Sequence, residues 1–400
     1  MSQPVLVCLL TGQHIPNLIS VKQYKPQTLI LVASTAMASR AKPFLAALKA
    51  GGLDYDFRHE IVRLADETSL EKVIESATGI LEKHKNQPII LNISGGNKVM
   101  TIGFYTAFKD KSKIIYVENN KRESFLDLAG GCEQFIGTVG IEEFLQGYGS
   151  MGEKSLSTLQ QSESRAQAGY DCALALASGA QSVDLLQFDP EDETKDRELH
   201  QEFRKNGGKL LKLYWTHFAI NHKDALAKWG VDPDLESVAI NKYQAEYLTG
   251  GWLEVFIWGL LKKHADYLKI NDVNIGFVAK PISNKNASGN DFDVCFIRDL
   301  ELFIIECKSG DQSHDSQADV LYKVEAIKRQ YGALNARTIV ATTGTNIYKR
   351  NTEIIKQNLL DRLSYFNASI IDRNGIQQLA LAHDNPDSIA NIMFPGAKPR

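Results

Sequence analysis

The chain has 400 residues, 44% of them hydrophobic, and a formal net charge of −3. This length supports two or three domains with full cores, and the near-neutral charge argues against a basic coat that binds nucleic acid along the whole chain. The five cysteines form no Cys-x-x-Cys pair, and no apolar run is long enough to span a membrane. We therefore expect a protein of the reducing cytoplasm that makes no membrane contact.

Apolar segments of strand length alternate with helical segments in residues 1–145. Strands are predicted at 4–10, 28–32 and 88–93, and a helical segment follows each of them. Buried strands that alternate with helices indicate an α/β fold with a parallel, doubly wound sheet of the Rossmann-like kind. Such sheets bind their ligands beyond the carboxyl ends of the strands.

Three small polar clusters follow these strands and are expected at one edge of the sheet. They are Thr11, Gly12 and Gln13; Ser34 and Thr35; and Ser94, Gly95, Gly96, Asn97 and Lys98. The third cluster points to an anion, because its glycines expose backbone N–H groups, the next helix directs its positive end there and Lys98 adds a charge. A plain glycine turn is the alternative, since the spacing is not that of a Walker A loop or a dinucleotide fingerprint.

The middle of the chain carries weaker patterns. A glycine-containing segment over 146–152 is typical of a domain boundary, and an alanine-rich stretch over 164–178 predicts a helix. The acidic run over 189–202 is expected to be solvated, and residues 209–220 are amphipathic. We interpret residues 146–245 as a helical connector and dimer scaffold.

Two acidic clusters stand out in the C-terminal part. Asp291 and Asp293 alternate along one segment, and Glu306 and Lys308 alternate along the next, so each pair shares a strand face. A hairpin that turns near 298–300 would bring the clusters together. Neighbouring carboxylates repel each other, and a hard divalent cation relieves that repulsion. A lysine beside the metal can orient an attacking water, which is the equipment for hydrolysing a phosphodiester.

The flanking residues favour a functional site over a solvated surface. The apolar run over 302–305 places Glu306 and Lys308 at the end of a buried strand, where unpaired charges are costly. Glu254 is a lone acid in an apolar helix that begins after Gly251. It is a candidate active-site carboxylate, and the alternative is an acid that stabilises the helix start through the macrodipole.

The order of Glu254, Asp293, Glu306 and Lys308 resembles the PD-(D/E)xK, or restriction-endonuclease-like, superfamily. The resemblance covers about 247–345, and Phe292 stands where that superfamily has proline.

The resemblance implies a metal site and a catalytic lysine. Asp293, Glu306 and the carbonyl of Cys307 would bind Mg²⁺ or Mn²⁺, Lys308 would position the water, and Glu254 would join through a bound water. Tyr322 and Lys323, on a helix expected over 319–331, would face the scissile phosphate.

Residues 92–98, Asn-Ile-Ser-Gly-Gly-Asn-Lys, resemble the motif of CARF domains. Together with the nuclease pattern they make the chain similar to the CRISPR ancillary nuclease family of type III immunity. The implied order is a CARF domain over 1–145, the connector over 146–245 and a restriction-like nuclease domain over 246–400. In this sequence Asn97 stands where threonine is common, and either side chain can contact a ribose or phosphate.

This second resemblance implies a homodimer that senses cyclic oligoadenylate, mostly cyclic tetra-adenylate, and cuts DNA or RNA in antiviral defence. Two alternatives stay open: a nucleotide-binding dimeric regulator with a degenerate nuclease domain, and a repair or restriction nuclease with another activator. The intact acidic set argues against the first, and the lack of a visible basic specificity domain argues against the second.

Overall fold

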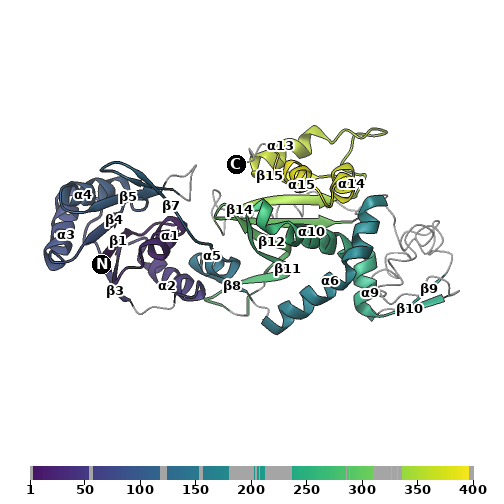
Figure 1. The fold of residues 1–400 in the computed structure, drawn as a ribbon, viewed down its shortest axis with the longest axis horizontal. Helices are drawn as coiled ribbons and strands as arrows, with labels where there is room; N and C mark the ends of the chain where they lie inside the picture. Colours follow the sequence, from purple (N-terminus) through teal and green to yellow (C-terminus); the bar gives the residue numbers. More distant parts are fainter. Residues whose placement is uncertain are drawn as a thin grey trace.

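The computed structural model describes the residues 3–53, 57–117, 124–152, 156–179, 202, 205–206, 208–211, 237–284, 286–287, 289–309, 326, 331 and 336–395. Two large sheets, each with its own helices, lie at either side of helix α5, and β9 and β10 form a separate two-stranded sheet (Figure 1). Among the helices in these ranges, none is long and apolar enough to cross a membrane.

The N-terminal sheet has seven strands in the order β3-β2-β1-β4-β5-β6-β7. The first five are parallel and the last two are antiparallel additions. Their bounds are β1 (Val5–Leu9), β2 (Thr28–Ala33), β3 (Arg58–Arg63), β4 (Ile89–Asn92), β5 (Lys113–Val117), β6 (Ser124–Asp127) and β7 (Cys132–Gln134). The predicted parallel sheet is confirmed.

Helices cover both faces of this sheet, because the central strand β1 is apolar at every position. Leu6 and Cys8 pack with α1 (Ile15–Tyr24), α2 (Ala41–Ala50) and α5 (Ile141–Gly147). Val5 and Val7 pack on the opposite face. The helices there are α3 (Leu70–Lys83) and α4 (Lys98–Phe108), and the short helix η1 (Ala38–Arg40) precedes α2.

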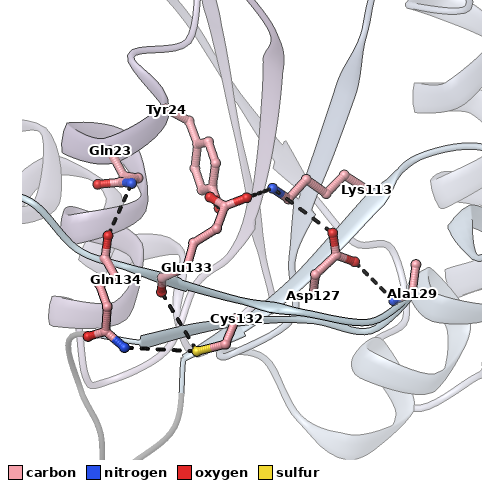
Figure 2. Close-up of polar contacts among 8 residues, drawn as sticks. All are labelled: Gln23, Tyr24, Lys113, Asp127, Ala129, Cys132, Glu133 and Gln134. Carbon is pink, nitrogen blue, oxygen red and sulfur yellow. Dashed lines mark hydrogen bonds and ion pairs between the residues drawn. The ribbon is translucent and has the colours of Figure 1, made fainter.

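The β6–β7 hairpin is held by polar contacts to β5 and α1 (Figure 2). Glu133 of the hairpin pairs with Lys113 of β5 and accepts a hydrogen bond of 2.9 Å from the Tyr24 hydroxyl. The Lys113 ammonium also lies 4.0 Å from Asp127 and 5.1 Å from the centroid of the Tyr24 ring. These contacts anchor the outer end of the sheet.

The C-terminal sheet has six strands in the order β15-β14-β13-β12-β11-β8. Strands β8, β11, β12 and β13 pair antiparallel in that order, and β13, β14 and β15 pair parallel. The bounds are β8 (Ser150–Gly152), β11 (Ile270–Pro281), β12 (Asn290–Arg298), β13 (Glu301–Lys308), β14 (Ala336–Thr342) and β15 (Ala368–Ile371). Arg298 pairs with Glu301, which confirms the predicted hairpin, and its turn residues Asp299 and Leu300 have φ of 51° and 62°.

One face of the C-terminal sheet is covered by α6 (Leu156–Gly179), α10 (Trp252–Lys263), α14 (Arg373–Leu381) and α15 (Pro386–Met393). Helix α13 (Gln357–Tyr365) packs separately against β14. The remaining elements are β9 (Gly208–Leu211), β10 (Ser237–Ile240), α9 (Lys242–Glu246), η2 (Tyr247–Gly251) and α11 (Ala265–Leu268).

Several predicted segments lie wholly or mostly outside the described residues. They are the acidic run over 189–202, most of the amphipathic stretch over 209–220, and the helix over 319–331 with Tyr322 and Lys323. The alanine-rich stretch over 164–178 is part of α6, which packs on α10 of the C-terminal body. The predicted domain limits stay a prediction.

Helix α5 contacts both bodies. The Ile141 amide donates a hydrogen bond of 2.6 Å to the Asp272 carboxylate of β11. Lys22 of α1 forms an ion pair of 2.9 Å with the buried Glu143. One continuous apolar cluster then runs from α1, α2 and α5 to the second face of the C-terminal sheet. The two bodies therefore share a core at this junction.

Candidate functional site

The antiparallel register of β12 and β13 places Asp293 opposite Glu306. Val294 pairs with Ile305, and the two acids are the next residues on their strands. The Cys307 amide donates a hydrogen bond of 2.7 Å to Asp293 Oδ2. Only 15% of the Asp293 side chain and 1% of the Glu306 side chain are exposed. Two carboxylates thus meet at the buried end of a hairpin.

Lys308 lies beside both acids. Its Nζ is 3.9 Å from Asp293 Oδ2 and 3.9 Å from Glu306 Oε2, and its side chain is 31% exposed. The expected common face of Glu306 and Lys308 is therefore present, because the strand alternates its side chains. At this distance the Lys308 ammonium partly balances the charge of the two carboxylates and still reaches solvent.

Glu254 enters the same site from the first turn of α10. Burial, then the charges of Asp293 and Asp291, raise the pKa of Glu254 to about 8, and Lys308 opposes that shift. The start of α10 approaches the end of β13 closely, since a Cβ on Gly250 would lie 2.9 Å from Ser309 Oγ. The structure thus brings together all four residues that the sequence proposed as catalytic.

The donor atoms of this site are all oxygens, which suits a hard divalent cation. Burial and mutual repulsion of the carboxylates are visible in the raised pKa of Glu254, and a bound cation would relieve both. Among the residues that the structure describes, no three His, Cys, Asp or Glu side chains are arranged as a metal site. A cation here would therefore need the Cys307 carbonyl and water besides Asp293 and Glu306.

The three polar clusters of the N-terminal sheet lie at the carboxyl ends of the adjacent parallel strands β2, β1 and β4. The first and third clusters touch, because a Cβ on Gly95 would overlap the Leu9 carbonyl oxygen and lie 3.1 Å from Thr11 Cγ2. Gly96 has φ of 78°, which favours glycine. The exposed members of the edge are Gly12, Thr35, Asn97 and Lys98, and Gln13 is half-buried.

Some polar side chains of this edge shape the loops themselves. Ser94 Oγ donates to Asn92 Oδ1 at 2.6 Å and accepts from the Val117 amide at 2.8 Å. Asn97 Oδ1 accepts from the Met100 amide at 2.9 Å and caps α4. The expected contact of Asn97 with a ribose or phosphate stays a prediction. Ser34 Oγ accepts from the Met37 amide at 3.3 Å.

Asn92 organises the edge, although the sequence indicated it only as a strand end and as the first residue of the stretch that resembles the CARF motif. It is fully buried, and its Nδ2 donates to Asn17 Oδ1 at 3.0 Å and Ser20 Oγ at 2.9 Å. Asn17 Nδ2 donates in turn to the Leu9 carbonyl at 3.0 Å. An amide that ends an apolar strand is the signal that could have found this network, because buried amides need partners.

His14 is a second residue that the sequence reasoning missed. It directly follows the first polar cluster and is 5% exposed, with its ring 4.5 Å from that of Tyr148 and 5.8 Å from that of Phe144. Neither ring nitrogen has a hydrogen-bond partner within the part of the chain that the structure describes. Burial, and secondarily the charge of Arg40, lower the pKa of His14 to about 3.

A Rossmann-like sheet with a glycine-rich edge, joined to a hairpin that carries Asp293, Glu306 and Lys308, defines a nucleotide-sensing domain fused to a restriction-like nuclease. Residues 5–143 match the model of the Card1 CARF domain, and residues 241–366 match that of the Card1-like endonuclease domain. The chain therefore joins a CARF domain to an endonuclease domain, both of the Card1-like family. Comparison with curated proteins gives no match.

Solved structures share the fold over nearly the whole chain. Can2 from Sulfobacillus thermosulfidooxidans, in complex with cyclic tetra-adenylate, has a TM-score of 0.66 at 18% identity, covering 94% of this chain and 97% of that one. Protein VC1899 from Vibrio cholerae has a TM-score of 0.75 at 16% identity, covering 96% and 98%. A type III CRISPR defence DNA nuclease activated by cyclic oligoadenylate has a TM-score of 0.53 at 16% identity, covering 91% and 52%.

Proposed function

We propose that the protein is a metal-dependent endonuclease that a cyclic oligoadenylate, with cyclic tetra-adenylate as the expected ring, switches on in type III CRISPR defence. The observation that carries this proposal is the convergence of Asp293, Glu306 and Lys308 in a chain that also has a CARF domain. The complex of Can2 with cyclic tetra-adenylate supports the choice of activator.

In the nuclease site, Asp293, Glu306 and the Cys307 carbonyl would hold Mg²⁺ or Mn²⁺. The cation supplies Lewis-acid polarisation of the phosphate and an acidified water. Lys308 can hold the attacking water and stabilise the negative charge that develops on the phosphate oxygens. Glu254 would join through a bound water. Burial and the neighbouring carboxylates raise its pKa, and a bound cation would oppose that shift and favour the carboxylate that accepts a hydrogen bond from this water.

In the sensor, the predicted contacts to the ring come from Thr11, Gly12, Gln13, Ser34, Thr35, Ser94, Gly95, Gly96, Asn97 and Lys98. One copy of this edge covers half of a ring with two-fold symmetry, so we propose a homodimer with one ring on its axis. Ile102 and Tyr105 of α4 are 54% and 42% exposed, only a turn or two beyond Lys98. A second copy of the chain would cover these apolar side chains.

We also place the protein in the cytoplasm. All five cysteines are free thiols in the structure, which suits a reducing compartment.

Cleavage assays with the full chain test the proposal. Purified protein is incubated with Mn²⁺ or Mg²⁺, with cyclic tetra-adenylate or cyclic hexa-adenylate, and with plasmid, single-stranded DNA or RNA. We expect cleavage that needs both metal and ring and stops in EDTA. Sedimentation should give a dimer, and calorimetry one ring for every two chains. Cleavage at equal rate without any ring would contradict the switch, and tight ring binding without cleavage of any substrate would favour the regulator alternative.

A further inference from the structure

A pocket of about 690 Å³ opens beside the proposed catalytic centre, between α6, α9 and α10. Its size falls in the usual range of small-ligand sites. Its lining includes Glu254 of α10, Arg165 of α6 and Tyr243 of α9. The proposed chemistry uses only Glu254 among these residues, so the greater part of the pocket has no role in hydrolysis itself.

Arg165 and Tyr243 form a cationic and aromatic pair in this pocket. The Arg165 guanidinium carbon lies 3.9 Å from the centroid of the Tyr243 ring. Both side chains are exposed, and 51% of Tyr243 is accessible. A cation over one face of an aromatic ring fixes the ring's orientation at little entropic cost. The pair is therefore a preformed surface in contact with solvent, and it lines the same pocket as Glu254.

We infer that Arg165 and Tyr243 form a nucleotide subsite for the nucleic acid that is cut at Asp293, Glu306 and Lys308; this inference rests on the proposed function. The Tyr243 ring stacks on an unpaired base of the substrate strand, and the Arg165 guanidinium contacts a phosphate of the same strand. Aromatic rings and arginines combine in this way wherever proteins hold single strands without reading their sequence.

The overall charge of the protein favours a local subsite over a general attraction for nucleic acid. A chain with a net charge of −3 has no general attraction for a polyanion, and the acids of the catalytic centre repel one. A base stacked on Tyr243 adds affinity that does not depend on charge. Stacking needs a base whose face is free, and neighbours cover both faces inside a duplex. The subsite therefore takes single-stranded or locally unpaired DNA or RNA.

Binding measurements distinguish this subsite from a purely structural contact between α6 and α9. The Kd of a short fluorescein-labelled DNA single strand is measured by anisotropy on the full chain carrying Lys308→Ala, which prevents cleavage. Tyr243→Ala should raise the Kd about tenfold, and Tyr243→Phe should keep it near the parent value. Arg165→Gln should flatten the dependence of log Kd on log salt concentration by about 0.7.

Strands with a single abasic position, moved along the oligonucleotide, give a readout that a structural role would not move. The parent protein should lose about tenfold in affinity at one abasic position, and Tyr243→Ala should lose nothing further there. Tyr365→Ala and Arg362→Ala are matched controls, because both residues are exposed on α13, outside the pocket. Both controls should bind every strand like the parent.

Equal abasic profiles in the parent and in Tyr243→Ala, or an unchanged Kd, would overturn the subsite. If Tyr243→Ala lowers the melting temperature, Tyr243→Leu gives the same test, since leucine still packs against Arg165 but cannot stack as an aromatic ring. Cleavage by the wild type is followed in parallel. Its absence with every ring would contradict the proposed function, whereas the abasic profile would still decide the subsite.

Discussion

Two glutamates on β13 have different charged neighbours, and this difference distinguishes a structural acid from a candidate catalytic one. Glu301, at the start of the strand, forms an ion pair of 2.7 Å with Arg337. Glu306, near its end, is 1% exposed and lies beside Lys308 and opposite Asp293. The charge of Glu301 is balanced directly by Arg337, whereas Glu306 shares Lys308 with the carboxylate of Asp293.

This contrast gives a matched pair of variants. We expect Glu306→Gln and Lys308→Ala each to reduce the rate of activated cleavage at least a hundredfold, because each removes a group that acts on the reacting phosphate or water. Glu301→Gln alters a buried acid on the same strand and should leave that rate within a few-fold of the wild type. The measurement is the single-turnover rate with saturating ring and metal.

Circular dichroism and calorimetric ring binding control for folding in these variants. A wild-type rate in both Glu306→Gln and Lys308→Ala would remove the active-site assignment. Loss of ring affinity in step with loss of cleavage would instead indicate a general folding defect.

At the scale of elements, α5 is the link between the sensor and the nuclease sheet. His14 packs against Phe144 of this helix and against Tyr148, which directly follows it. The Tyr148 ring lies 6.0 Å from that of Tyr331, whose hydroxyl is 3.4 Å from Ser150 Oγ on β8. A side chain next to the proposed ring-binding edge thus reaches a strand of the nuclease sheet through two aromatic contacts.

The burial of His14 predicts a sensitivity to acid. Its folded pKa of about 3 lies below the ordinary value of 6.5, so between these values only the unfolded chain binds the proton. The contribution of His14 to the free energy of unfolding is therefore fully present above pH 6.5. Below that value it falls by about 1.4 kcal/mol for each pH unit. The groups that face the His14 imidazole are Arg40 and the neutral side chains of Phe144 and Tyr148.

His14→Leu should remove this dependence, because leucine fills the space without a proton to gain and the ring nitrogens make no described hydrogen bond. Urea unfolding from pH 7 to pH 5 measures the slope. His59→Leu, at an exposed position, serves as the control and should keep the wild-type slope. Identical slopes in His14→Leu and the wild type would show that another group causes the acid sensitivity.

The contact between the loops after β1 and β4 predicts a strict requirement for glycine at position 95. A methyl group on Gly95 would overlap the Leu9 carbonyl oxygen, so Gly95→Ala must displace one loop and should lower the unfolding free energy by about 1–3 kcal/mol. Gly79→Ala in α3 meets no atom within 4 Å and should raise it by about 1 kcal/mol. Equal stability of the two variants in urea unfolding would contradict the close approach of the loops.

At the scale of the whole molecule, the sequence predicted the structures that depend on neighbouring segments better than the contacts between distant ones. The parallel sheet and the β12–β13 hairpin followed from the apolar strands and the turn at 298–300, since both depend on neighbouring segments. The shared core around α5 could not be predicted, because His14 and Phe144 are far apart in the sequence and apolar periodicity does not specify a packing partner. The packing of α6 on α10 was missed for the same reason.

The same limit applies to the candidate sites. The predicted hairpin brought Asp293, Glu306 and Lys308 together, and the resemblance to the PD-(D/E)xK superfamily added Glu254 to them. The sequence could not show that Asn97 caps α4, because the same amide suits a helix start and a ligand equally well. Nor could it show that Tyr243 faces Arg165, which depends on how two separate helices pack.

A switch that joins the two bodies must obey the thermodynamics of linked equilibria. A ring shifts the protein between an inactive and an active arrangement only through its different affinity for the two. Lys98 is exposed at the start of α4, beside the amides of Gly95 and Gly96. Its charge can meet a phosphate most closely when two copies of the edge close around the ring, so its contribution belongs mainly to the closed form.

Lys98→Ala should therefore raise the ring concentration for half-maximal cleavage about tenfold or more, since a lost charged hydrogen bond weakens the closed form in both subunits. Metal binding at Asp293 and Glu306, followed by Mn²⁺ titration without a ring, should not change. Lys109→Ala alters an exposed lysine at the other end of α4 and should leave the curve in place. Coincident curves of cleavage rate against ring concentration for the wild type and Lys98→Ala would place the switch elsewhere in the sensor.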